Sequence, residues 1–377
     1  MIYMDNGATM PMKECAVQEL YRCIQAVSFN PSAEYRPAMK ARNEIYISRN
    51  EIAECIGADA SEIIFTSSGS EANSLTLQGC VKMLSKKGNH LIVSSIEHAS
   101  VLKNVKQLEK AGFSVTYIHP DNDGIIAVKD IENAIRPETI LVSVMYANNE
   151  IGSIQPIREI GMLLREKGIV FHTDAVSAAG YLDIDVERDG IDIMSVSGHK
   201  FGGPMGTGFL YKRNTVALEP YILGGDQENG YRAGTENVAG IAAMRAAFVD
   251  ACQHRLENNR ILQANQKTML ELFKKEIPGI VINGSEEKRL PGNVHVSING
   301  MSADRMLMYL DMEGICASSG AACMNRKQQP SYVLEEIGAK ERGSNSLRFT
   351  LSAEHTQSEI EFVVSVIKKY LPACAEK

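Results

Sequence analysis

The segment Ser197-Gly198-His199-Lys200 contains the residue types that bind an aldehyde cofactor. It follows the apolar stretch 191–196, which is typical of a buried strand. A lysine held out of water loses its proton more readily, and the neutral amine can form a Schiff base with an aldehyde. A solvated surface lysine is the alternative that this segment leaves open. Lys200 is therefore a candidate for covalent attachment of a cofactor.

Small residues at 66–71 indicate a second site, an anion cradle. Gly69 and Ser70 follow an apolar run and stand at the start of a predicted helix. Backbone N–H groups at a helix start point toward an anion, and small residues allow it to approach. An ordinary serine cap is the alternative. The segment is not a P-loop, and 203–208 does not match G-x-G-x-x-G, which weakens a nicotinamide interpretation.

Four further polar residues occupy positions where they could act on a cofactor or substrate. Asp174 could pair with a protonated ring nitrogen and make a pyridinium an electron sink, or could cap a helix. His98 could cover an aromatic ring or move protons, or could be structural. Asn149 offers an amide to a ring hydroxyl or a carboxylate. Arg348 could clamp a carboxylate through two hydrogen bonds, or form a structural ion pair.

Cys323 lies among small residues and is followed by polar residues as far as Pro330, which predicts an exposed loop. Exposed thiols near cations are the reactive ones, although a buried, inert thiol is the alternative. The eight cysteines form no C-x-x-C pair, and no Cys/His cluster has zinc-site spacing. We therefore predict no metal site.

Apolar strand-like stretches alternate with helical ones, such as 157–167, as far as about residue 221. Strands this apolar are covered on both faces, which predicts an α/β fold with a mainly parallel sheet. Ligands gather at the carboxyl ends of such strands. A long helical region that resembles a connecting helix between domains is expected over about 237–275, followed by a smaller α+β unit. We predict a large cofactor-binding domain over 13–255, and a small domain formed by 1–12 and 256–377 that carries the Cys323 loop.

Composition excludes several classes of protein. The net charge of −7 gives no general attraction to nucleic acid or to anionic lipid. No apolar run is long enough to span a bilayer, and the first residues do not form a signal peptide. We expect a cytoplasmic protein.

Taken in order, these segments resemble the pyridoxal-phosphate cysteine desulfurases of the NifS/IscS type, over nearly the whole chain. The matching segments are 3–11, 30–32, 70–73, 97–98, 148–152, 172–175, 197–200, 232–237 and 318–323. The resemblance implies fold-type I of the pyridoxal-phosphate enzymes and a homodimer with shared active sites.

The resemblance also implies roles for single residues. Lys200 would carry pyridoxal 5'-phosphate, Asp174 would hold its ring nitrogen, and His98 would stack on the ring and act in catalysis. Asn149 would lie near the ring hydroxyl and the substrate, and Arg348 would bind the substrate carboxylate. The phosphate would be held by Gly69, Ser70, Ser197 and His199, with Thr235 reaching the phosphate of the partner subunit.

The reaction implied is conversion of L-cysteine to L-alanine, with a persulfide left on Cys323. The sulfur would pass to a scaffold or carrier protein, for iron–sulfur cluster assembly, other thio-cofactors or tRNA thiolation. Ser177 stands where a glutamine that bonds the ring hydroxyl is usual, and Met324 follows the cysteine in place of Thr or Ser. The alternatives are a selenocysteine lyase, a class V aminotransferase, or a desulfurase-derived partner-binding protein with weak catalysis.

Overall fold

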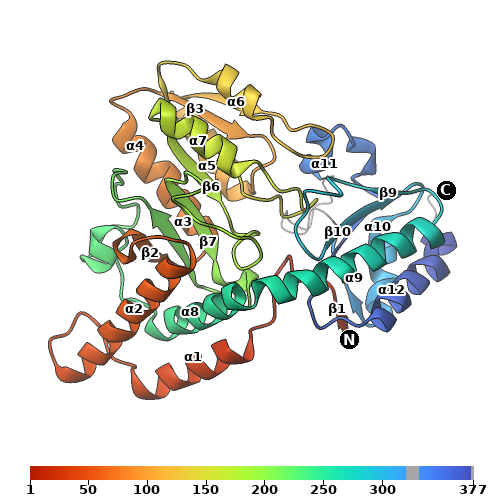
Figure 1. The fold of residues 1–377 in the computed structure, drawn as a ribbon, viewed down its shortest axis with the longest axis horizontal. Helices are drawn as coiled ribbons and strands as arrows, with labels where there is room; N and C mark the ends of the chain where they lie inside the picture. Colours follow the sequence, from red (N-terminus) through yellow and green to blue (C-terminus); the bar gives the residue numbers. More distant parts are fainter. Residues whose placement is uncertain (320–330, 375–377) are drawn as a thin grey trace.

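A seven-stranded sheet forms the centre of the larger part of the molecule (Figure 1). The structure is a computed structural model that describes residues 1–319 and 331–374. The strand order is β2-β8-β7-β6-β5-β3-β4, and only β8 runs against its neighbours. The strands are β2 (Ile63–Thr66), β3 (His90–Ser94), β4 (Ser114–Ile118), β5 (Thr139–Ser143), β6 (Val170–Asp174), β7 (Ile193–Ser197) and β8 (Gly208–Lys212).

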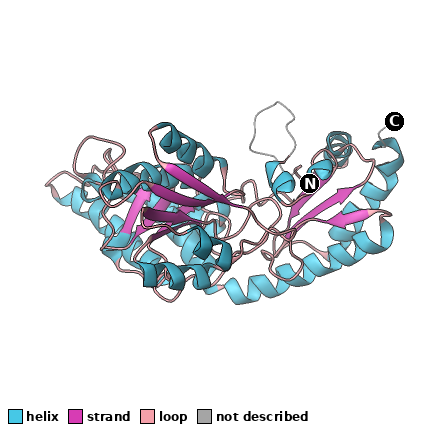
Figure 2. Cartoon of the chain, turned by 90° about the horizontal axis from the view of Figure 1, so that it is seen from above, coloured by secondary structure: helices cyan, strands magenta, loops and turns pink. Residues whose placement is uncertain are grey.

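Helices cover the sheet on both sides, so the predicted α/β fold with a mainly parallel sheet is confirmed (Figure 2). The helix that follows β2 runs from α3 (Gly69–Ser74) through a π-helical stretch (Leu75–Cys80) to α4 (Val81–Leu84). Gly168 ends α7 with φ 65°, the left-handed conformation that favours glycine at this position. The other helices between the strands are α5 (Ala99–Lys110), α6 (Val128–Ala134) and α7 (Ile157–Lys167).

Two helices form the long helical region predicted over 237–275, with a break that the sequence did not indicate. They are α8 (Val238–Gln253) and α9 (Arg255–Glu276). The chain leaves the helical conformation at His254, whose Nδ1 lies 3.0 Å from the carbonyl oxygen of Asp250 and so caps the end of α8. Helix α8 packs beside α1 (Glu14–Ala26) and α2 (Arg36–Cys55), while α9 runs toward the smaller part (Figure 1).

The smaller part contains an antiparallel sheet with the order β12-β10-β9 and a pair of parallel strands, β1 and β11. Its buried apolar residues, among them Met4, Phe273, Val296 and Phe349, form a cluster separate from those of the large sheet. We keep the division into 13–255 and the remainder as a proposal that these clusters support. The elements are β1 (Ile2–Tyr3), β9 (Ile280–Ile282), β10 (Asn293–Ile298), α10 (Ala303–Met312), β11 (Ile315–Cys316), α11 (Tyr332–Glu336), β12 (Ser346–Thr350) and α12 (Gln357–Tyr370).

A membrane span is absent from the described part of the chain, where no helix combines the necessary length and apolar character.

Candidate active site

The predicted site residues of the larger part follow strands that end at one edge of the sheet. Strands β2, β3, β5, β6 and β7 all run in the same direction, so their carboxyl ends meet there. Gly69 follows β2, His98 follows β3 and Asn149 follows β5. Asp174 ends β6, and Lys200 stands in the short turn after β7.

Lys200 closes a 3₁₀ turn (Gly198–Lys200) and is partly buried. Its Nζ donates hydrogen bonds to the carbonyl oxygens of Gly7 and Ala8, the latter at 2.9 Å. These carbonyls belong to the segment that follows β1 of the smaller part. The amine is therefore held in a fixed direction by a region distant in sequence.

Asp174 is buried, with 4% of its surface exposed, and both of its oxygens accept hydrogen bonds. Oδ1 accepts from the Val176 N–H at 3.0 Å, and Oδ2 accepts from Asn73 Nδ2 at 2.7 Å. Burial and the nearby charge of Asp174 raise the pKa of Glu97 well above its usual range. The Asp174 carboxylate, held at both oxygens, is suited to face a cationic ring nitrogen.

The start of the helix after β2 is shaped for an anion. Ser68 caps the helix, because its Oγ accepts a hydrogen bond from the Glu71 N–H at 3.2 Å. The serine cap that the sequence left open is therefore Ser68. Ser70 does not act as the cap, and its side chain is exposed. A Cβ on Gly69 would lie 2.4 Å from Val176 Cγ2 and 3.4 Å from the Cβ of Ser197. Gly69 therefore lies against the residues that follow β6 and end β7.

His199 adds a neutral donor to this cradle. Burial, together with the charge of Lys200, lowers the pKa of His199 to about 4, so the ring is uncharged near neutral pH. Its Nδ1 lies 3.1 Å from Thr9 Oγ1. Backbone N–H groups, hydroxyls, a fixed lysine and a held carboxylate form the donor set that pyridoxal phosphate requires, and they fit it.

His98 caps α5, which is the structural role that the sequence left open. Its Nδ1 accepts from the Ser100 N–H at 3.2 Å and lies 2.8 Å from Ser100 Oγ. Capping fixes the ring at the carboxyl edge of the sheet, so the structural role and a catalytic one are compatible.

A small cavity of about 40 Å³ is lined by Asn149, Ser177, Lys200 and Thr350. It brings together three predicted site residues from separate loops. The side chain of Asn148 builds the turn that presents Asn149, because its Oδ1 accepts from the N–H groups of Glu150 and Ile151 at 2.9 and 3.0 Å.

Arg348 lies on β12, with only 2% of its surface exposed. It donates to the Asn149 carbonyl oxygen at 3.0 Å and to Asp5 Oδ1 at 2.9 Å, so the ion pair left open by the sequence is present. The other oxygen of Asp5 accepts from Ser318 Oγ at 2.7 Å. Arg348 Nε is buried and has no hydrogen-bond partner among the residues that the structure describes.

Glu150 is a buried carboxyl group that sequence reasoning missed. Burial raises its pKa to about 7, against the opposing effects of Ser331, Arg348 and His98. Ser331 Oγ donates to Glu150 Oε2 at 2.5 Å. This bond fixes the chain directly after residue 330 beside the site.

Thr235 does not line the small cavity. Cys323 falls outside the described residues. Thr235 is exposed on a segment held by the ion pair between Arg232 Nε and Glu71 Oε1, at 2.8 Å. Burial opposes ionisation of Glu71, but hydrogen bonds from Arg232 and Ser67 outweigh it and lower its pKa.

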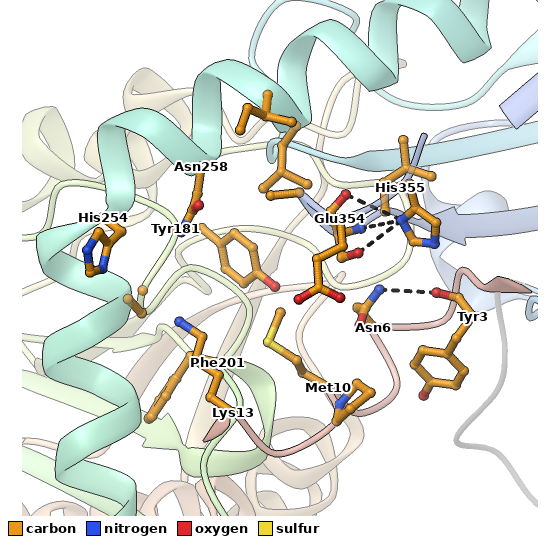
Figure 3. A pocket seen from close by; sticks show the side chains of 18 of the residues that line it. Tyr3, Asn6, Met10, Lys13, Tyr181, Phe201, His254, Asn258, Glu354 and His355 are labelled. Carbon is orange, nitrogen blue, oxygen red and sulfur yellow. Dashed lines mark hydrogen bonds between the residues drawn. The ribbon is translucent and has the colours of Figure 1, made fainter. Parts of the chain in front are cut away.

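A larger cleft of about 990 Å³ lies beside the first residues and the junction of α8 and α9 (Figure 3). Tyr181 and Glu354 extend into it, and Lys13 forms an ion pair with Asp250 at its wall, at 2.7 Å. No residue predicted to hold the cofactor or the substrate lines it. The larger opening is therefore not the predicted site.

The chain matches the family model "Aminotransferase class-V" over residues 2–363. It belongs to the class-V aminotransferases. Cysteine desulfurase IscS of Clostridium botulinum is 42% identical over 98% of this chain and 94% of its own. Putative cysteine desulfurase IscS 1 of Bacillus subtilis is 39% identical over 98% and 99%.

Solved structures agree with these relatives. A NifS-like protein superposes with a TM-score of 0.93 at 28% identity and covers 99% of both chains. SspA in complex with cysteine superposes with a TM-score of 0.83 at 35% identity, over 94% of this chain and all of that one. The NifS/IscS resemblance and the fold-type I prediction are confirmed, and pyridoxal phosphate is the cofactor of the chain as of its family.

Proposed function

We propose that this chain is a cysteine desulfurase that converts L-cysteine to L-alanine and keeps the sulfur as a persulfide on Cys323. The observation that carries the proposal is the cavity shared by Lys200, Asn149 and Ser177, with Arg348 bonded to the backbone carbonyl oxygen of Asn149. The names of the relatives, all cysteine desulfurases, support the same reaction.

The residues of the chain divide the work. When bound, pyridoxal phosphate supplies an electron sink for the electrons of the substrate. Asp174 would hold the ring nitrogen, His199 and the start of α3 would hold the phosphate, and Lys200 would supply the amine that carries the cofactor. Arg348 Nε is a buried donor without a partner among the described residues, which suits a substrate carboxylate.

The sulfur step conserves atoms and electrons. The Cys323 thiolate attacks the sulfur of cysteine, an S–S bond forms, and the C–S bond breaks. The electron pair of that bond goes to the former side-chain carbon, which takes up a proton and becomes the methyl group of alanine. The persulfide then carries the oxidised sulfur, so no external oxidant is needed.

Two chains would share each site. Exposed apolar side chains gather on α1, α2 and the segment 221–223, as expected of a surface that a second copy covers. They include Tyr21, Ile24, Met39, Tyr46 and Leu223, the last with 80% of its surface exposed. Thr235, exposed on its anchored segment, would reach the partner's cofactor phosphate.

The test is incubation of purified protein with L-cysteine, followed by assay of alanine and by mass spectrometry of the Cys323 peptide. We expect alanine to form and Cys323 to gain one sulfur atom. A Cys323→Ala variant that kept full sulfide release would contradict the persulfide. Parallel assays with selenocysteine and with an amino-acid/keto-acid pair distinguish a lyase or an aminotransferase.

The recipient of the sulfur and the cytoplasmic location stay predictions. Iron–sulfur assembly is the first candidate, because the relatives carry the name IscS. Tracing labelled sulfur from Cys323 into purified scaffold proteins and into tRNA-thiolating enzymes tests it.

A further inference from the structure

A chain of hydrogen bonds links His98 to Asp174 through two residues that have no predicted role. Asn73 Nδ2 donates to Asp174 Oδ2 at 2.7 Å and to Ser100 Oγ at 2.9 Å. Ser100 Oγ lies 2.8 Å from His98 Nδ1. Asn73, with 1% of its surface exposed, is buried between helix α3, which carries it, and helix α5. The two groups predicted to hold the cofactor ring are therefore parts of one network.

The direction of each hydrogen bond follows from the chemistry of its ends. A carboxylate only accepts, so the amide nitrogen of Asn73, not its oxygen, faces Asp174. The same nitrogen donates to Ser100 Oγ, which leaves the single hydroxyl proton of Ser100 for His98 Nδ1. The backbone N–H of Ser100 also donates to Nδ1, at 3.2 Å. Two donors converge on Nδ1, so the ring proton is on Nε2.

We infer that Ser100 is a positioning residue that fixes His98 as the Nε2–H tautomer, and that Asn73 ties this tautomer to the orientation of Asp174. The use of that proton rests on the proposed function. Formation of alanine requires a proton at the carbon that loses sulfur, and His98 in this tautomer presents one at Nε2; the ring stays neutral when Nδ1 takes up a proton in the same step. The network thus prepares a proton donor and orients the ring-nitrogen carboxylate together.

A control variant can distinguish the proposed positioning role of the network from a purely structural role. The same helices are also joined by Asn104, which donates to Ser74 Oγ at 3.0 Å and accepts from Gln78 at 2.9 Å. Neither of these bonds touches His98 or Asp174. Ser74→Ala is therefore a matched control that removes a serine hydroxyl between the same helices.

The test reads the tautomer by ¹⁵N NMR of holoenzyme labelled in its histidine rings, without cysteine, and His98→Gln assigns the signals. We expect the Nε2–H pattern in the unmodified protein. Ser100→Ala should move the Nδ1 resonance, because one of its two donors is lost. Asn73→Leu should move it in the same direction, because the Ser100 hydroxyl can then turn away. Ser100→Thr should restore it, and Ser74→Ala should leave it unchanged.

Kinetics give a second readout. Ser100→Ala should lower kcat about tenfold with little change in KM, since the loss is in proton transfer. An Nδ1–H pattern in the unmodified protein, or Nδ1 signals identical in Ser100→Ala, would overturn the inference. Absence of alanine formation with the expected tautomer would instead reject the proposed function, because the NMR experiment contains no substrate.

Discussion

The residues predicted to hold the cofactor come from one stretch of the chain, whereas those around the predicted substrate carboxylate come from its two ends. Asp174, Gly69 and Lys200 stand at the ends of strands in one sheet, and hydrogen bonds hold Asp174 and Lys200 in direction. Arg348 instead meets Asp5, 343 residues away. The cofactor side is held by bonds within the chain, while an Arg348 that binds the substrate carboxylate as proposed, through Nε and a second nitrogen, would give up its bond to Asp5.

Removing the amine is the strongest test of the cofactor side. Lys200→Ala should lower alanine formation at least about a thousandfold, because no other group would replace the covalent attachment. The measurement is turnover together with the absorbance of the bound cofactor. Lys82→Ala removes an exposed lysine that forms an ion pair with Glu219, and this control should be unaffected. Normal turnover in Lys200→Ala would exclude the proposed site.

Asp174→Asn should cost about a hundredfold in kcat, since it removes the charge that stabilises a cationic ring nitrogen. An amide can still accept from Val176 N–H at Oδ1, so the fold should persist. Circular dichroism checks the fold, and stopped-flow absorbance checks the chemistry. A loss of folding that equals the loss of activity would make Asp174 structural.

On the substrate side, Arg348→Lys should raise KM for cysteine about tenfold, because a lysine cannot keep two directed hydrogen bonds. Asp5→Asn should lower KM, since it removes the competing carboxylate. It should also lower the free energy of unfolding by about 2 kcal/mol, because the buried guanidinium loses its counter-charge. Opposite changes in KM for the two variants would support the exchange, and parallel changes would reject it.

Glu150 gives a pH-dependent test of the connection beside the site. Its pKa of about 7 in the folded protein lies above the usual value of about 4.3 in the unfolded chain, so the folded state holds the proton more tightly. The stability it contributes is present below about pH 4 and is lost as the pH rises to 7. Glu150→Gln should therefore gain stability relative to the unmodified protein between pH 5 and pH 8, by about 1–3 kcal/mol. Thermal unfolding of both proteins at pH 5 and pH 8 measures this gain. A stability difference between the two proteins that does not change with pH would contradict the prediction.

The smallest expected effect is at Ser177. Ser177→Gln should tighten cofactor binding by about two- to fivefold, because the longer amide can reach the ring hydroxyl from the cavity wall. Equilibrium titration of the cofactor checks this. Ser177→Leu introduces a side chain similar in size to glutamine but without hydrogen-bonding groups, and it should not tighten cofactor binding.

Much of the fold follows from local patterns. Apolar strands of four or five residues alternate with amphipathic helices, and the predicted helix 157–167 matches α7, where Gly168 supplies the left-handed end. Ligands bind at the carboxyl ends of parallel strands, and this principle groups residues that are far apart in sequence. Asp174, His98 and Lys200 were therefore predictable as a set.

The missed residues act through contacts that no local pattern records. Asn73 lies within a matching segment, but its bond to Asp174 joins helix α3 to the end of β6, two elements that are neighbours only in the folded chain. Asp5 is 343 residues from its partner, and Glu150 is recognisable only by its burial and its bond to Ser331. The break at His254 was missed because the residues on both sides favour a helix, and the bonds of the His254 backbone N–H and ring to the Asp250 carbonyl are visible only in the structure.

The pairing of Asp5 with Arg348 also has a consequence for synthesis of the protein. On a ribosome adding about 5–20 residues per second, Asp5 emerges roughly 17–70 s before Arg348 is made. The carbonyls of Gly7 and Ala8 that hold Lys200 lie only a few residues beyond Asp5. The segment whose carbonyls orient Lys200 is therefore fixed only when translation is nearly complete. A truncated nascent chain would contain the strand ends that hold the cofactor but not the bonds that orient Lys200.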